Sequence, residues 1–355
     1  MHSVKRLIPV LLTLVITITI TLAMASPVSA QQGAEIRVTD SEAEADQPDV
    51  AVDSKGNVHI AYCDSYDTST YEIWYTMLDN NGNTLIDATL ITLDDNEKSR
   101  RPAIVVDSED KVHIIWQDDM TWGLFYTKLD PSLDDQDGDA AGPAAITLVD
   151  DKEVANFGGP GDEAGAHARI AVDSKDDIHI VCESTSDYDA IYYLKIDNDG
   201  NELVAPQVIR QTSHDNVWRA SPDVAVDSDN NAHITWNDID ESMLYETYYM
   251  MLDGSNGSTL IDATRITPDD GRNSKRQSIV VDFEGRVHII WADQRGEDQQ
   301  IYYTKLDPSL DDQDGDSADE LAITLIDDTA LTPDYGVSRN HPTSAIHCGH
   351  YIHIT

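Results

Sequence analysis

The chain has 355 residues, with 66 Asp or Glu against 23 Lys or Arg, so its formal net charge is −43 at pH 7. Such a field repels nucleic acids and anionic membrane surfaces, and it attracts metal cations and basic partners. We therefore exclude nucleic acid as a partner. The three cysteines, Cys63, Cys182 and Cys348, stand in unlike contexts and indicate neither a disulfide framework nor a metal site.

The first 30 residues carry the pattern of an export signal. The basic pair Lys5-Arg6 precedes an apolar run from Leu7 to about Met24, and Val28-Ser-Ala30 is a small-residue cleavage site. An uncleaved membrane anchor is the alternative, because the run approaches spanning length. We expect a signal peptide over residues 1–30, a mature domain over residues 31–355 without a further membrane span, and an extracellular or cell-surface location.

One segment, Pro48 to Tyr62, recurs along the chain. Its copies are Pro102 to Trp116, Ala168 to Cys182, Pro222 to Trp236 and Gln277 to Trp291, with a degraded copy from Pro342 to Thr355. Each copy holds one histidine, at positions His59, His113, His179, His233, His288 and His353, which are 54, 66, 54, 55 and 65 residues apart. Spacings of this size are typical of propeller blades.

Each unit carries four strand signals. In the first unit, Val50-Ala-Val52 and Val58 to Tyr62 flank a hairpin-turn sequence, an aromatic strand covers Ile73 to Leu78, and Leu90-Ile-Thr92 is a short fourth strand. The other fourth strands are predicted at Ala145 to Thr147, Val208-Ile209, Arg265 to Thr267 and Ala322 to Thr324. Because no stretch has a helical period, we predict an all-β fold, a β-propeller of four-stranded blades. The expected blades are about 48–101, 102–167, 168–221, 222–276 and 277–341, with a partial blade at 342–355.

Two longer repeats bear on the number of blades. Thr84 to Thr89 recurs as Thr259 to Thr264, and Tyr126 to Asp139 recurs as Tyr303 to Asp316. The first unit thus matches the fourth and the second matches the fifth, which indicates a duplicated three-blade block and a six-bladed ring; seven or eight blades stay open.

The last blade is expected to take its fourth strand from residues 36–39, which would close the ring. It then lacks only its third strand. Since an open sheet edge is an aggregation hazard, we expect the natural chain to continue past Thr355.

Segments of the form Val-Asp-Ser-x-Gly-Asn-Val-His-Ile-x-Trp, with Trp291 to Gly296 and Ile301 to Asp307, resemble the repeats of sialidase-like (BNR-type) propeller proteins of bacterial and archaeal surfaces. The resemblance covers Ile36 to Thr355. No Asp-box of the form Ser-x-Asp-x-Gly-x-Thr-Trp occurs in the sequence, so the resemblance implies the blades and no particular activity.

The central mouth of the propeller is the expected binding site. The first strand of a blade is innermost, so the loops before it and those after the second strand share one face. The loops before first strands carry arginines although cations are scarce, and aspartates follow the second strands. Because Arg binds carboxylates and Asp accepts sugar hydroxyl groups, we predict an anionic or hydroxyl-rich ligand. The predicted ligand-binding residues are Arg101, Arg169, Arg219, Arg276, Asp118, Asp238, Asp293, Trp116, Trp236 and Trp291. The alternative is that these Arg and Asp residues pair with each other between adjacent blades.

The main functional expectation is a secreted, non-enzymatic propeller that binds a carbohydrate, such as a surface polysaccharide, or a surface protein. One alternative is a sialidase-like glycoside hydrolase. That activity would require three convergent arginines, for which Arg101, Arg219 and Arg276 are available, a Tyr paired with a Glu, for which Tyr245 and Glu246 are adjacent, and an Asp acid. A structural cell-envelope repeat protein is the other alternative.

Two acidic loops have carboxylates at alternating positions and a glycine at the bend, as a hard cation requires. They hold Asp135, Asp137 and Asp139, and Asp312, Asp314 and Asp316. They differ from the EF-hand, because the glycine comes one position early and no bidentate Glu follows. We predict structural calcium at both loops, with solvated acidic turns as the alternative.

The recurring histidine is expected to belong to blade packing, since a residue present in every repeat does not mark one active site. It lies mid-strand within reach of a recurring aspartate (Asp53, Asp107, Asp173, Asp227, Asp282). We therefore predict a buried hydrogen bond from the histidine to that aspartate or to the backbone, and no metal site.

Overall fold

The structure is a computed structural model that describes residues 36–39, 45–65, 68, 70–119, 123–157, 165–184, 190–211, 221–239, 244–268, 270–295, 299–312, 315–316, 320–332, 342–347 and 351–354. The predicted signal peptide, residues 1–30, lies outside them. The chain divides into two units, Met1–Val38 and Thr39–Thr355. All strands of the described residues belong to the second unit. No helix in the described part of the chain has the length and apolar character needed to cross a membrane.

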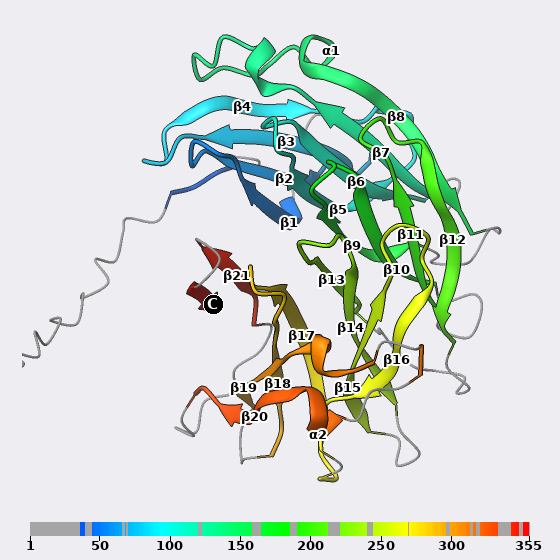
Figure 1. Cartoon of the computed structure of the whole chain (residues 1–355). Helices are drawn as coiled ribbons and strands as arrows, with labels where there is room; N and C mark the ends of the chain where they lie inside the picture. Colours follow the sequence, from blue (N-terminus) through cyan, green and yellow to red (C-terminus); the bar gives the residue numbers. More distant parts are fainter. Residues whose placement is uncertain are drawn as a thin grey trace, which may run out of the picture. The chain divides into compact units, whose positions relative to one another are not determined.

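The second unit contains five four-stranded sheets, each an antiparallel meander in chain order (Figure 1). The first holds β1 (Ala45–Val52), β2 (Val58–Asp64), β3 (Glu72–Leu78) and β4 (Thr84–Leu90), and the second holds β5 (Ser99–Val106), β6 (Val112–Asp118), β7 (Gly123–Leu129) and β8 (Thr147–Asn156). The third holds β9 (Ala166–Val172), β10 (Ile178–Ser184), β11 (Ala190–Ile196) and β12 (Glu202–Arg210), and the fourth holds β13 (Asp223–Val226), β14 (Ala232–Ile239), β15 (Tyr245–Leu252) and β16 (Thr259–Arg265). The fifth holds β17 (Ser274–Val281), β18 (Val287–Asp293), β19 (Gln300–Leu306) and β20 (Thr324–Ala330), and the hairpin β21 (Ser344–His347) and β22 (Tyr351–Ile354) follows. The predicted all-β class is confirmed.

The recurring motif closes the hairpin between the first and second strands of each sheet. In the first sheet, Asp53 Oδ1 accepts hydrogen bonds from the backbone N–H groups of Lys55 (2.9 Å) and Asn57 (2.7 Å). Gly56 has φ +82°, a left-handed conformation that glycine adopts without strain. The aspartate thus fixes the turn, and the chain must reverse at this point in every unit.

The predicted packing role of the histidines is confirmed. Nε2 of His113 lies 3.0 Å from Asp107 Oδ2, and Nδ1 lies 2.8 Å from the hydroxyl oxygen of Tyr126 on the third strand. The other four sheets repeat this Asp–His–Tyr arrangement, at His59, His179, His233 and His288. Each arrangement links the turn, the second strand and the third strand of one sheet, and in four of the five both ring nitrogens have a hydrogen-bond partner; in the first sheet Nε2 of His59 lies 3.5 Å from Asp53 Oδ2.

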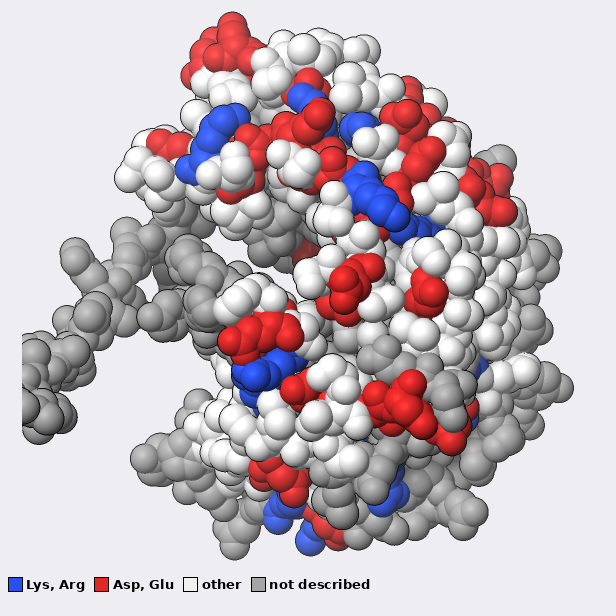
Figure 2. All heavy atoms as spheres, in the orientation of Figure 1, with Lys and Arg blue, Asp and Glu red and all other residues white. Residues whose placement is uncertain are grey.

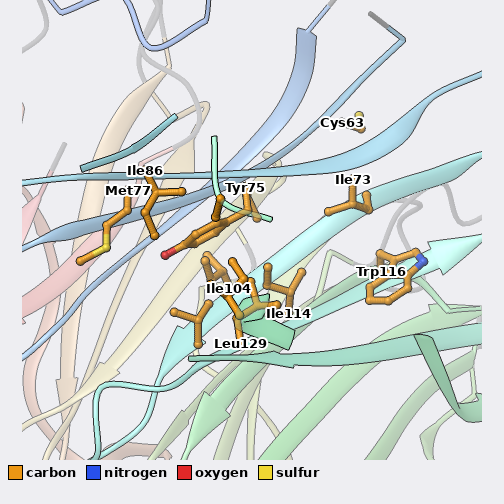
Figure 3. Packing of buried hydrophobic residues seen from close by; sticks show 13 residues of the cluster. Cys63, Ile73, Tyr75, Met77, Ile86, Ile104, Ile114, Trp116 and Leu129 are labelled. Carbon is orange, nitrogen blue, oxygen red and sulfur yellow. The ribbon is translucent and has the colours of Figure 1, made fainter. Parts of the chain in front are cut away.

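Apolar side chains fill the spaces between neighbouring sheets. Figure 3 shows the cluster between the first and second sheets, where Tyr75 and Ile73 from β3 face Ile104, Ile114 and Trp116. The first strands of successive sheets contact one another in the order β1, β5, β9, β13, β17 and β21. A series of small sheets that bury their faces only against neighbours is consistent with a propeller.

The fourth strands differ from the prediction. In the first and fourth sheets they are the repeated segments Thr84–Leu90 and Thr259–Arg265, not the residues that follow them. In the second and fifth sheets the apolar residues near Ala145 and Ala322 form one-turn helices, α1 (Pro143–Ile146) and α2 (Glu320–Ile323), and the strand begins after each helix. The short apolar triplets that suggested strands are strand ends or helical turns.

Each acidic loop forms a backbone clasp to the preceding sheet. In the loop between β7 and β8, Gly138 N–H donates to Leu85 O (3.1 Å), and Asp139 O accepts from Asp87 N–H (2.7 Å) on β4. The loop between β19 and β20 repeats both bonds to β16, from Gly315 to Leu260 and from Asp262 to Asp316. Of the two longer sequence repeats, one therefore supplies the outer strand of this contact and the other supplies the loop.

Ring closure is not seen in the described residues. Residues 36–39, predicted to complete the last blade, carry no strand, and the last sheet has only β21 and β22. Val50 on β1 is 58% exposed, whereas its equivalents Ile104 and Ile279 are each 4% exposed in sheets that have a preceding neighbour. The number of six blades stays a prediction.

Candidate functional site

A left-handed residue stands near the start of the first strand of every four-stranded sheet, within the strand in four sheets and just before β13 in the fourth sheet. These residues are Gln47 (φ 53°), Arg101 (57°), His167 (50°), Ser221 (45°) and Arg276 (62°). Four of the pairings between first and second strands shift register at this point, as a β-bulge does. Positive φ is uncommon for residues other than glycine, and recurring bulges of this kind re-aim side chains. The bulge residues are therefore the first candidates for function.

Buried polar side chains near the ends of the second strands hold these bulges in place. Gln117 Oε1 accepts from Arg101 Nη1 (2.7 Å), and Asn237 Oδ1 accepts from the backbone N–H of Arg276 (2.9 Å). Glu183 has two partners, because Oε1 lies 2.5 Å from His167 Nδ1 and Oε2 accepts from Ser221 N–H at 3.1 Å. The last contact joins the third sheet to the fourth.

A pocket of about 460 Å³ opens among the third, fourth and fifth sheets. It is lined by His167, Arg169, Ser221, Pro222, Asp223, Asn237, Tyr245, Lys275, Arg276, Gln277, Ser278, Pro342 and Thr343. Its described lining residues include three basic side chains and one carboxyl group, although acidic residues outnumber basic ones in the chain by 66 to 23. Acidic side chains are spread over the face visible in Figure 2, with basic ones in small groups. The pocket is thus a local reversal of charge that suits an anionic ligand.

Two half-buried carboxyl groups lie within electrostatic range of Arg169. Burial raises the pKa of Asp49 and that of Asp223, and the positive charge of Arg169 opposes the rise in both. Asp223 Oδ2 also accepts from Ile279 N–H at 3.1 Å, and Asp49 Oδ2 accepts from Ile104 N–H at 3.0 Å. Each aspartate therefore joins its own first strand to the next one, so Asp223 is a structural part of the pocket wall.

His167 and Tyr245 are the pocket groups that can transfer protons. When Glu183 is ionised it can only accept, so Nδ1 of His167 donates in this contact, and Nε2 holds a lone pair whenever the ring is neutral. Tyr245 begins β15, and Lys275 Nζ lies 5.1 Å from the centroid of its ring. Burial, and then the charge of Arg276, lower the pKa of Lys275. A base, a hydroxyl group and several cations thus share one pocket.

The predicted arginines separate into two groups. Arg169 and Arg276 line the pocket, whereas Arg101 is not among the lining residues and donates to Gln117 in the second sheet. Arg219 lies outside the described residues. The arginines that contact predicted aspartates are different ones: Arg210 Nε lies 2.6 Å from Asp238 Oδ2, and Arg295 Nη2 lies 2.7 Å from Asp293 Oδ2.

The remaining predicted ligand-binding residues lie away from the pocket lining. Asp118 is half-buried at the end of β6, opposite Ser99. Trp116, Trp236 and Trp291 are at most 1% exposed and belong to the apolar clusters between sheets. Their indole rings stabilise the contacts between blades.

The adjacent pair Tyr245 and Glu246 does not act as one unit. Neighbouring residues of a strand point to opposite faces. Tyr245 lines the pocket, while Glu246 is fully buried and accepts from Thr267 Oγ1 at 2.5 Å.

The acidic loops hold no group of three or more His, Cys, Asp or Glu side chains arranged for a metal ion, as far as the chain is described. Asp314 lies outside the described residues. Repulsion from Asp137 raises the pKa of Asp139. A bound cation would relieve this repulsion between the two carboxylates. Structural calcium at Asp135, Asp137, Asp139, Asp312, Asp314 and Asp316 stays a prediction.

His167 and Asn237 are functional candidates that the sequence reasoning missed. The signal that could have found His167 is its place in the repeat, where the other units have Gln47, Arg101, Ser221 and Arg276. A position whose backbone conformation recurs but whose side chain differs among the units can carry function, because the fold does not fix the side chain.

No protein family profile matches the chain, and no curated protein is similar to it. Solved structures do share its fold. An ulvan lyase of a polysaccharide lyase family, bound to -[GlcA(1-4)Rha3S]-, has a TM-score of 0.53 at 10% identity and covers 86% of this chain and 77% of its own. An α-L-arabinofuranosidase from Fusarium graminearum, with an iminosugar inhibitor, has 0.51 at 8% identity, covering 86% and 85%. A protein of unknown function from Dyadobacter fermentans has 0.52 at 9% identity, covering 86% and 88%.

At these identities the likeness establishes the fold alone, which is the propeller-like fold of glycoside hydrolases and polysaccharide lyases. The finer resemblance to sialidase-like repeats stays a prediction. The main functional expectation, a non-enzymatic binding propeller, is contradicted, because the neighbours of known activity are carbohydrate-active enzymes.

Proposed function

We propose that the protein is a carbohydrate-active enzyme that cleaves an acidic polysaccharide by β-elimination in the pocket among the third, fourth and fifth sheets. One observation carries the proposal: three cations surround a His and a Tyr in a protein that is otherwise strongly acidic. A uronate unit offers the matching chemistry, because its carboxylate binds cations and acidifies the neighbouring C–H bond.

The lining residues can divide the reaction among them. Arg276 and Lys275, with Arg169, neutralise the uronate carboxylate and stabilise the negative charge that develops on it. His167 takes the C5 proton at Nε2, the C4=C5 double bond forms, the C4–O4 bond breaks, and Tyr245 gives a proton to the departing oxygen. His167 then releases its proton to solvent and Tyr245 regains one, so the enzyme is restored, no water is consumed, and the two products account for all atoms of the substrate.

Hydrolysis needs a different arrangement. Glycoside hydrolases of the usual kinds place two carboxyl groups on either side of the bond that is cleaved. Among the described lining residues Asp223 is the one carboxyl group, and its oxygens already bond the backbone of Ile279 and Val224. The pocket therefore favours elimination over hydrolysis.

The test supplies the purified protein with ulvan and other uronate polysaccharides, and with neutral arabinan as the comparison. We expect new reducing ends together with the ultraviolet absorbance of a C4=C5 double bond conjugated to the carboxylate, on uronate polymers only. Reducing ends without that absorbance would mean hydrolysis, and no cleavage of any polymer would refute the assignment.

The variants locate the reaction in the pocket. His167→Gln and Tyr245→Phe are each expected to lower kcat by about 10²- to 10⁴-fold, the usual contribution of a general acid or base. Arg101→Ala is the matched control, since Arg101 occupies the same bulge position in the second sheet outside the pocket lining. It should keep kcat and KM near wild type.

A further inference from the structure

The Glu183 side chain lies at the seam between the third and fourth sheets and touches both. It is 4% exposed on β10, and its two oxygens are divided between two partners. Oε1 lies 2.5 Å from Nδ1 of His167, and Oε2 accepts the backbone N–H of Ser221 at 3.1 Å. Ser221 O in turn accepts from the amide of Gln277, so the contact extends to the fifth sheet.

We propose that Glu183 is a positioning residue that fixes the Nδ1–H tautomer of His167 and anchors the ring to the fourth sheet, so that Nε2 presents its lone pair to the pocket. The catalytic part of this inference rests on the proposed function. The tautomer part does not, because it follows from the two hydrogen bonds of an ionised Glu183.

A glutamine at position 183 cannot make the same two hydrogen bonds as the carboxylate of Glu183. A carboxylate has an acceptor for each partner, whereas a glutamine has one acceptor oxygen and one donor nitrogen. In Glu183→Gln the side-chain oxygen accepts the hydrogen bond from the N–H of Ser221, because that N–H can only donate and could not pair with the amide nitrogen. The amide nitrogen then faces His167 and donates to Nδ1, which forces the proton to Nε2. The variant is nearly isosteric and reverses the tautomer.

The loss of the lone pair from the pocket should lower kcat between about 10-fold and about 10⁴-fold, the range found when the carboxylate that orients a functional histidine is removed. KM should stay within about threefold, since Glu183 is not among the pocket-lining residues. A purely structural role for Glu183 would lower stability without this split.

The experiment combines ¹⁵N-histidine NMR with kinetics on the intact chain. The His167 signals are identified by their absence from His167→Gln. We expect the Nδ1–H tautomer in the wild type and the Nε2–H tautomer in Glu183→Gln, and no further fall of kcat when Glu183→Gln is added to His167→Gln. Gln117→Ala, the equivalent position in the second sheet, should leave the His167 tautomer unchanged.

The results separate the two proposals. An Nδ1–H tautomer that persists in Glu183→Gln would overturn the positioning role, and so would wild-type kcat in that variant. A wild-type protein that cleaves no polysaccharide would contradict the proposed function only, since the NMR result still decides whether Glu183 sets the tautomer.

Discussion

Replacement of Glu72 by glutamine should remove a large pH dependence from the stability of the protein. Glu72 begins β3 with no exposed surface, and its carboxyl group accepts from the hydroxyl groups of Thr92 (2.6 Å) and Thr70 (3.1 Å). Burial is the main cause that raises the pKa of Glu72 from 4.5 to about 7, and the two hydroxyl groups oppose it. The folded protein therefore holds this proton over a pH range in which the unfolded chain has lost it.

The sign follows from that difference in proton binding. A raised pKa means that the stabilisation is complete below about pH 4.5 and is lost as the pH rises to about 7. At about 1.4 kcal/mol per pH unit, the free energy of unfolding falls by about 3 kcal/mol across this interval because of Glu72 alone. Glu72→Gln stays neutral, so it should lack this fall and be more stable than the wild type at about pH 8.

Urea unfolding at a series of pH values measures the effect in both proteins. Thr92→Val is the second variant, since it removes one hydroxyl group that favours the ionised form, and the fall in stability should therefore extend to higher pH than in the wild type. It also leaves the N–H of Ile73 without its partner and so lowers stability at every pH. Equal dependence of stability on pH in wild type and Glu72→Gln would refute the reasoning.

Three further predictions concern the framework. Gly138→Ala should lower stability more than Gly271→Ala: both glycines have positive φ, but a Cβ on Gly138 would lie 3.1 Å from Thr84 O, whereas Gly271 has no neighbour within 4 Å. If the two variants lowered Tm by the same amount, the contact of Gly138 with β4 would not explain the loss of stability. Tyr249→Phe should cost about 1–3 kcal/mol in chemical denaturation, because Nδ1 of buried His233 loses its partner; a cost near zero would contradict that role. Calcium binding at the acidic loops requires that Tm rise with added calcium and fall with chelator, and a Tm indifferent to both would exclude it.

The repeat allowed the blades and their polar links to be predicted, because the same residues stand at the same steps in every unit. His113 and Asp107 could be paired from spacing alone, while the partner Tyr126 could not, since strand register sets which aromatic residue faces the ring. The fourth strands were misplaced for a related reason. Only two of the strand residues of Thr84–Leu90 are fully buried, so the segment gives a weaker apolar signal than the triplet at its end.

Of the predicted site residues, Arg169 and Arg276 line the candidate pocket, because propeller topology gathers the starts of the first strands, whereas the direction of each side chain depends on strand parity. Trp116 and Gln117 are adjacent, yet the first enters the core between sheets and the second holds a bulge. A shift of one residue along a strand exchanges these roles. His167 was missed because a bulge breaks the two-residue period at this point, so no pattern in the sequence shows where the ring is aimed.

The clasp between an acidic loop and the preceding outer strand limits how such a protein can grow or shrink. Because Gly138 and Leu85 belong to different blades, neither blade is a self-contained cassette. Gene deletion or recombination that separates the first blade from the second, or the fourth from the fifth, would leave a loop without its strand and a strand without its loop. Adjacent blades must therefore be inherited and engineered together, and boundaries for chimaeras are better placed beside the third blade, which has neither half of the clasp.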